Sequence, residues 1–179
     1  MRRTPPWAYR LYANPVLRAV LGWDWPRRNI MWIRSAPALR IVEIGSGGGF
    51  YTRHLVRHVD SAATVVIMDP CPSAVGALCT RLRGKVVGVS GVGEHLPFSS
   101  SSLDVLFYSY SLEEFDDPYR GISEAARVLR PGGQLVLFLW RPAVRGSRWR
   151  ELLAWAERDF ALERACAGVQ NIRRSYRRR

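Results

Sequence analysis

Residues 39–50 read LRIVEIGSGGGF, a strand-like segment that runs directly into a glycine-rich turn. The segment over 39–44 is short and rich in β-branched residues, which is typical of a strand buried in a sheet. Residues 50–56 then place apolar side chains on one face of a predicted helix. A strand, a glycine turn and a helix form a ligand cradle at the carboxyl end of the first strand of an α/β sheet. Glycine permits positive φ and close approach of a ligand, and the N–H groups that open the helix favour a polar or anionic group.

The spacing of the glycines narrows the kind of ligand. A dinucleotide fingerprint, G-x-G-x-x-G, requires its third glycine where Phe50 stands. The chain instead carries an acid and then glycines at alternate positions: Glu43, Gly45, Gly47 and Gly49. This E-x-G-x-G-x-G pattern resembles motif I of the class I S-adenosylmethionine-dependent methyltransferases. An ordinary tight strand–helix turn also explains the glycines, so the interpretation depends on the motifs that follow.

Strand-like and helix-like segments alternate from residue 39 onward. The predicted strands cover residues 39–44, 64–68, 85–89, 103–108 and 134–140, with helices between most of them. Such alternation is typical of a parallel sheet with helices on both faces. We therefore expect an α/β fold, a three-layer, Rossmann-like, doubly wound and mostly parallel sheet with a helical N-terminal extension. Few residues remain after 161, which predicts short or truncated C-terminal strands, and a truncated sheet would expose an edge that favours a homodimer.

An acid ends the second predicted strand. Asp69 follows residues 64–68, where a carboxylate can accept two hydrogen bonds from a ribose diol. Its alternative role is to cap the helix predicted over 73–83, although Ser73 can do that alone. Methyltransferases of this class have an acid at this place. The resemblance thus implies that Asp69 binds the ribose of S-adenosylmethionine and that Pro70 lies at the same site.

Residues 91–98 read GVGEHLPF and resemble the family's G-D-A-x-x-L-P-F loop, which borders the adenine. Val92 stands where the family commonly has an aspartate, and a valine cannot accept a hydrogen bond from the adenine amino group. The resemblance implies that Gly93 and Glu94 border the adenine through main-chain and apolar contacts. His95 is expected to lie in the loop and to take no part in the chemistry.

A further marker is RVLRPGGQL, residues 127–135, which recurs in the small-molecule and quinone branch of the family. Its expected role is structural, because Pro and Gly turn the end of a helix into the strand over 134–140. By resemblance, Glu43 orients the amino group of the methionine moiety. The remaining residues that the resemblance places around the cofactor are Gly45, Ser46, Gly47, Gly49 and Ser109.

The sequence names no firm catalytic residue. Methyl transfer from a sulfonium is an in-line displacement with a good leaving group, so orientation can contribute up to ~7–11 kcal/mol. A base is needed only for a poor nucleophile such as a phenol or an alcohol. His54, Tyr110 and Glu113 are the nearest candidates for that base. Glu113 lies in an acidic segment just before a predicted helix. Negative charge there is equally explained by its favourable interaction with the helix N-terminus.

The chain of 179 residues carries a net charge of +12, almost wholly from arginine. Such a charge suits nucleic acid, an anionic membrane surface or an acidic substrate, or it reflects an arginine bias spread over a solvated face. Three cysteines without a C-x-x-C pair predict free thiols and no metal site. Apolar runs are shorter than the ~20 residues of a membrane span, and arginines interrupt any signal-peptide core, so we expect a cytoplasmic protein.

We divide the chain into a helical lid or extension (1–37), an S-adenosylmethionine-binding methyltransferase domain (38–165) and a basic C-terminal tail (166–179). The aromatic residues of the extension suit packing against the sheet, a lid over the substrate or an anchor at a lipid interface. The predicted function is transfer of a methyl group from S-adenosylmethionine to a small-molecule acceptor, such as a lipid or a phenolic natural product.

Two alternatives stay open. The first is a basic binding module, or a non-methylating enzyme such as a cyclase, that keeps the methyltransferase fold and contacts nucleic acid or an anionic membrane. It predicts binding that weakens as salt rises. The second is a methyltransferase that acts on RNA, which is less favoured because no N-P-P-Y-type motif follows the strand over 103–108.

Overall fold

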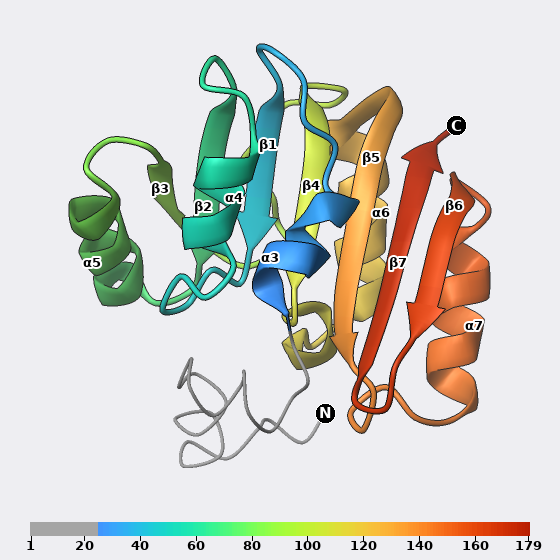
Figure 1. Cartoon of the computed structure of the whole chain (residues 1–179). Helices are drawn as coiled ribbons and strands as arrows, with labels where there is room; N and C mark the ends of the chain where they lie inside the picture. Colours follow the sequence, from blue (N-terminus) through green and yellow to red (C-terminus); the bar gives the residue numbers. More distant parts are fainter. Residues whose placement is uncertain (1–24) are drawn as a thin grey trace.

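The structure is a computed structural model that describes residues 25–179. A seven-stranded sheet with the strand order β3-β2-β1-β4-β5-β7-β6 forms its centre (Figure 1). The strands are β1 (Arg40–Ile44), β2 (Thr64–Asp69), β3 (Val87–Ser90), β4 (Leu103–Ser109), β5 (Leu129–Trp140), β6 (Phe160–Ala167) and β7 (Asn171–Arg178). The first five strands are parallel, whereas β7 runs antiparallel to β5 and to β6. This arrangement confirms the predicted α/β, doubly wound, mostly parallel fold.

Helices cover both faces of the sheet and complete three layers. They are α3 (Pro26–Asn29), α4 (Thr52–His58), α5 (Pro72–Leu82), α6 (Pro118–Val128) and α7 (Ser147–Ala156), with short 3-10 turns η1 (Ile30–Trp32) and η2 (Leu112–Glu114). Figure 1 shows α3 and α4 on the near face and α6 and α7 on the far face. A hydrophobic core lies on each face of the sheet. Successive side chains of β4 point into one core and then the other, because side chains alternate along a strand. Val105 and Phe107 join the core under α4, and Leu106 and Tyr108 join the core under α6 and α7.

The C-terminal strands are neither short nor truncated, so this expectation is wrong. β6 and β7 have eight residues each. β7 pairs with β5 from Gln134–Arg177 to Trp140–Asn171 and with β6 on its other side. Residues 171–178, expected to belong to a basic tail, therefore form an internal strand, and that expectation is also wrong.

The arginines on one face of β7 do not prevent strand formation because they find acidic partners beside the strand. Arg174 lies 3.3 Å from Glu157, and Arg178 lies 3.4 Å from Asp159. Tyr176, between them on the same face, is fully buried. A strand with one buried ring and long side chains that reach outward can thus be rich in charge and still lie inside a sheet.

The described part of the N-terminal extension is helical and packs against the near face of the sheet. Ile30, Trp32 and Ile33 are buried there, and the side-chain amide of Gln134 in β5 donates to the Trp32 carbonyl at 2.8 Å. The earlier aromatic residues, on which a lid or an interfacial anchor depends, lie outside the described residues. Within residues 25–179, no helix combines the length and the hydrophobicity that crossing a bilayer requires.

Candidate functional site

The glycine-rich turn joins β1 to α4 at the carboxyl edge of the sheet. Gly45, Gly47 and Gly49 have φ values of 79°, 44° and 76°, which residues with a side chain rarely adopt. There is also no room for a side chain at two of them. A Cβ on Gly45 would lie 2.4 Å from the Cβ of Ser111, and a Cβ on Gly49 would lie 2.4 Å from a methyl group of Leu78. The alternation of glycines is therefore a requirement of this geometry.

Asp69 lies at the carboxyl end of β2, directly beside the turn. Its Oδ2 accepts the Gly47 N–H at 2.8 Å, and its Oδ1 accepts the Cys71 N–H at 3.0 Å. The structure thus brings together the acid and the glycine turn, as the sequence predicts. The hydrogen bond to Cys71 also gives Asp69 a second role just before α5, similar to the helix-capping role that the sequence left open. Each carboxylate oxygen keeps capacity for one more hydrogen bond, while Pro70 beside it is exposed.

One buried polar side chain precedes the turn and a second lies within it. Glu43 in β1 is fully buried, and its Oε2 accepts the Thr52 hydroxyl at 2.7 Å. Ser46 is only 4% exposed, and its hydroxyl has no hydrogen-bond partner among the described residues. A buried hydroxyl without a partner costs about 1–3 kcal/mol. A polar ligand in the turn would satisfy it. The sequence reasoning missed Thr52, although a hydroxyl at the start of the helix after the turn was a usable signal.

The loop after β3 contacts the loop after β4. A Cβ on Gly93 would lie 2.0 Å from the Phe115 ring, so the ring packs directly on the Gly93 backbone. Glu94 accepts the Asp116 N–H at 2.9 Å. The carboxylate expected to border the adenine therefore also holds this loop in place. Val92 is 45% exposed.

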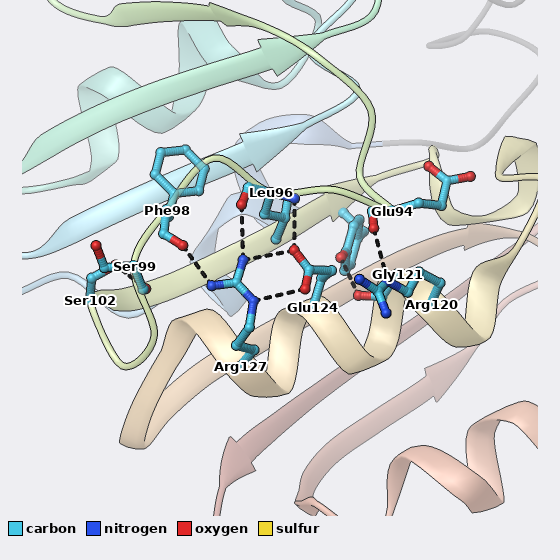
Figure 2. Close-up of polar contacts among 10 residues, drawn as sticks. Glu94, Leu96, Phe98, Ser99, Ser102, Arg120, Gly121, Glu124 and Arg127 are labelled. Atoms are coloured by element: carbon cyan, nitrogen blue, oxygen red, sulfur yellow. Dashed lines mark hydrogen bonds and ion pairs between the residues drawn. The ribbon is translucent and has the colours of Figure 1, made fainter.

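Figure 2 shows how the segment 94–98 is attached to α6. Glu124 accepts the Leu96 N–H at 2.8 Å and two hydrogen bonds from the Arg127 guanidinium, at 2.7 and 2.8 Å. Arg127 also donates to the carbonyls of Phe98 and Leu96 at 2.7 and 2.9 Å. The hydrogen bonds from Arg127 lower the pKa of Glu124 below its ordinary value. The RVLRPGGQL motif thus has a role that the sequence reasoning missed. Its first residue, Arg127, holds the segment 94–98 in place.

After β4 the chain crosses the carboxyl edge of the sheet, and the first residue of this crossing segment has a strained backbone. Tyr110 has a φ of 55°, which is uncommon for a bulky side chain. This turn brings Ser111 against Gly45, and the Ser111 hydroxyl donates to the Ile44 carbonyl at 2.8 Å. Ser109, the last residue of β4, is 6% exposed and lies at the same edge. The crossing segment therefore braces the glycine turn from the β4 side.

The three candidate bases contact different parts of the fold. The buried Glu113 accepts the Trp140 N–H at 2.7 Å, at the end of β5. The Tyr110 ring packs near Tyr51 and Phe138. Burial, together with nearby arginines, lowers the pKa of His54 in α4, which favours its neutral form. Each contact has a structural purpose, and none of them singles out a catalytic base.

Residues 42–137 match the methyltransferase domain family, which is more than half of the chain. The chain belongs to this family. Membership confirms the resemblance to the class I S-adenosylmethionine-dependent methyltransferases, whose cofactor is S-adenosylmethionine. The matched residues start within β1 and end within β5, and they include the glycine turn, Asp69 and the segment 94–98.

Known relatives and structures agree with this membership. An uncharacterised methyltransferase of Mycobacterium tuberculosis is 35% identical over 130 residues, which cover 72% of this chain and 51% of the relative. The demethylmenaquinone methyltransferase of Corynebacterium kroppenstedtii is 31% identical over 124 residues, covering 69% of this chain and 52% of that protein. The chain thus spans about half the length of these relatives. An S-adenosylmethionine-dependent methyltransferase of Aquifex aeolicus has the same fold, with a TM-score of 0.74 and 17% identity over 93% of this chain and 99% of the other.

Proposed function

We propose that this methyltransferase domain transfers a methyl group from S-adenosylmethionine to a small aromatic acceptor of the quinol or phenol class. One observation carries the proposal. In the glycine turn, the Gly47 N–H donates a hydrogen bond to Asp69, and the Ser46 hydroxyl is buried. This hydroxyl has no hydrogen-bond partner among the described residues. The acceptor class is supported by the similarity to a demethylmenaquinone methyltransferase. The similarity covers half of that protein, so the acceptor is the part that most needs a test.

Each residue of the cradle has a role in this proposal. Each carboxylate oxygen of Asp69 already accepts one backbone N–H and can accept one more hydrogen bond, which comes from a ribose hydroxyl. Glu43 orients the amino group of the methionine moiety, and Thr52 holds the Glu43 carboxylate in its rotamer. Gly93 and Glu94 border the adenine through the main chain. The other residues that line the cofactor are Gly45, Ser46, Gly47, Gly49, Pro70 and Ser109.

When bound, S-adenosylmethionine supplies an electrophilic methyl group on a sulfonium. The work of the protein is then to orient the two reactants, for which ~7–11 kcal/mol is available at most. The braced turn and the crossing segment after β4 are rigid elements suited to that work. A quinol oxygen or ring carbon becomes a stronger nucleophile when its hydroxyl loses a proton. His54, Tyr110 and Glu113 stay candidates for that proton, and we assign none of them.

Contact with other partners is a separate proposal. The charge of +12 suits an anionic membrane surface, from which a lipid-like acceptor can be taken, and suits nucleic acid less specifically. A homodimer was expected only from the edge of a truncated sheet, and the seven-stranded sheet is not truncated. A cytoplasmic location stays a prediction.

Two measurements test the proposal. Titration calorimetry of the chain with S-adenosylmethionine and with S-adenosylhomocysteine should give micromolar binding of both. Incubation with S-adenosylmethionine labelled in the methyl group should then move the label into a prenylated naphthoquinol or a phytyl hydroquinone. No binding of either cofactor form at millimolar concentration would contradict the cofactor site. Binding without transfer to any aromatic acceptor would contradict the acceptor class alone.

A further inference from the structure

Tyr51 is the second residue after Gly49 and is the N-cap residue of α4, the helix that follows the glycine turn. Its side chain is 1% exposed, and its ring packs edge-on against Phe107 and Phe138 at centroid distances of 5.7 and 5.2 Å. Its hydroxyl accepts a hydrogen bond from the Asn29 side-chain amide at 3.2 Å. Because Tyr51 follows the glycine turn by two residues along the backbone, the fixed position of its ring restricts the path of the turn.

Asn29 is the last residue of α3, in the N-terminal extension, and it is 4% exposed. Its Nδ2 donates to Tyr51, and its Oδ1 accepts a hydrogen bond from an Nη of Arg173 at 2.8 Å. Arginine can only donate, so the orientation of the amide is determined by its two partners. One buried side chain thus bridges the start of α4 to the strand β7.

Arg173 is itself held at a defined position. In β7 it pairs with Phe138 of β5 and with Cys166 of β6. Its guanidinium lies 5.9 Å from the centre of the Trp32 ring and donates to the Cys166 sulfur at 3.7 Å. A continuous set of contacts therefore leads from an internal strand, through the extension, to the residue beside the glycine turn.

We propose that Asn29 is a positioning residue for the cofactor. It holds the Tyr51 hydroxyl, and through Tyr51 it keeps the glycine turn in the conformation that binds S-adenosylmethionine. This inference rests on the proposed function. Three glycines with positive φ give the turn much freedom in the absence of such contacts. A turn that is already ordered binds more tightly because less conformational freedom is lost on binding. The extension is then part of the cofactor site, although none of the family motifs lies within it.

The test is calorimetric titration of the full chain and three single variants with S-adenosylhomocysteine. Tyr51→Phe removes only the hydroxyl, and Asn29→Leu removes the hydrogen bonds to Tyr51 and to Arg173 with little change in volume. Each should raise the Kd about 3- to 10-fold, the effect of one typical net hydrogen bond. Since both act through one contact, the double variant should raise the Kd by less than the product of the single effects.

Gln134→Leu is the matched control. Gln134 is also buried and also holds the extension, since its side chain donates to the Trp32 carbonyl and accepts the Arg34 N–H, each at 2.8 Å. It also donates to Ser175 of β7 at 2.9 Å, and none of these hydrogen bonds involves Tyr51. Thermal unfolding of each variant, measured in parallel, reports lost stability separately. Gln134→Leu should lower the Tm and leave the Kd unchanged. An equal rise in Kd for Gln134→Leu, or an unchanged Kd for Tyr51→Phe and Asn29→Leu, would overturn the inference. A wild-type chain that does not bind S-adenosylhomocysteine would overturn the proposed function itself.

Discussion

At the scale of single residues, the candidate site depends on side chains that serve the fold and the ligand together. Asp69 binds two backbone N–H groups and still has capacity for a diol. Glu43 is buried and is held by Thr52. Such residues are already ordered before the cofactor arrives, which lowers the entropy lost on binding. Their substitution should therefore affect affinity and stability to different extents.

Replacing Asp69 with alanine should weaken binding of S-adenosylmethionine at least tenfold. The substitution removes the charge-assisted acceptor of the ribose hydroxyls and the hydrogen bond that holds Gly47. Titration calorimetry measures the change. Asp60→Ala is the control, since Asp60 accepts a local hydrogen bond from the Ala62 N–H in the turn before β2 and lies outside the glycine turn. Equal affinity of Asp69→Ala and the wild type would remove the ribose assignment.

Replacing Gly45 with alanine should destabilise the protein by about 1–3 kcal/mol. A side chain there meets Ser111 at 2.4 Å and requires a residue other than glycine to keep a φ of 79°. Gly48→Ala provides the comparison, because a Cβ on Gly48 meets nothing within 4 Å. Urea unfolding of the two variants should separate them clearly. Similar stabilities would mean that the turn relaxes around the extra methyl group.

At the scale of elements, one ion pair holds the loop after β3 on helix α6. Glu124 is 6% exposed and accepts hydrogen bonds from Arg127 and from the Leu96 backbone. Charge-assisted, two-pronged contacts of this kind are stronger than single neutral hydrogen bonds. The loop therefore depends on a pair of residues in a helix that lies far from the glycine turn in sequence.

The contribution of this pair should depend on pH in a defined direction. Arg127 lowers the pKa of Glu124 in the folded state, while the unfolded chain has the ordinary value of about 4.3. The stabilisation is therefore complete above about pH 4.3 and is lost as the pH falls through the lower folded-state pKa. Glu124→Gln should be less stable than the wild type at pH 7, and the difference in urea unfolding should shrink in this acid range. Glu151→Gln, at an exposed position of α7, should show no such trend.

The elements themselves could be predicted where their signal was local. The strands over 64–68 and 103–108 match β2 and β4 to within one residue. The strand expected to begin at Gln134 instead begins at Leu129, which pairs with Leu103 of β4, and the register shifts before Gln134 pairs with Val105.

At the scale of the whole molecule, the sheet is complete only because its most basic segment lies inside it. β7 supplies partners to both β5 and β6, and its removal would leave β6 without any neighbour. The same strand carries Arg173, from which the contacts to Asn29 and the glycine turn begin. The C-terminal segment therefore supports both the fold and the candidate site.

Deletion of residues 171–179 should prevent folding, whereas a dispensable tail would be removed without loss. Circular dichroism and gel filtration of the shortened chain test this directly. Arg177→Gln serves as the control, because it changes the charge of the segment and leaves the strand in place. Its exposed pair with Glu163, at 3.0 Å, should contribute no more than about 1 kcal/mol. A folded, monomeric deletion variant would contradict the role of β7.

Local patterns in the sequence were sufficient for the parallel half of the sheet, the glycine turn, Asp69 and the family, because each is encoded by neighbours along the chain. Three features required tertiary contacts: the place of β7 in the sheet, the attachment of the segment 94–98 to α6, and the contacts from Arg173 through Asn29 to Tyr51. The last of these joins residues 144 and 22 positions apart. Residues so distant share no sequence period, and a buried amide or an arginine-rich strand is satisfied only by partners that folding brings to it.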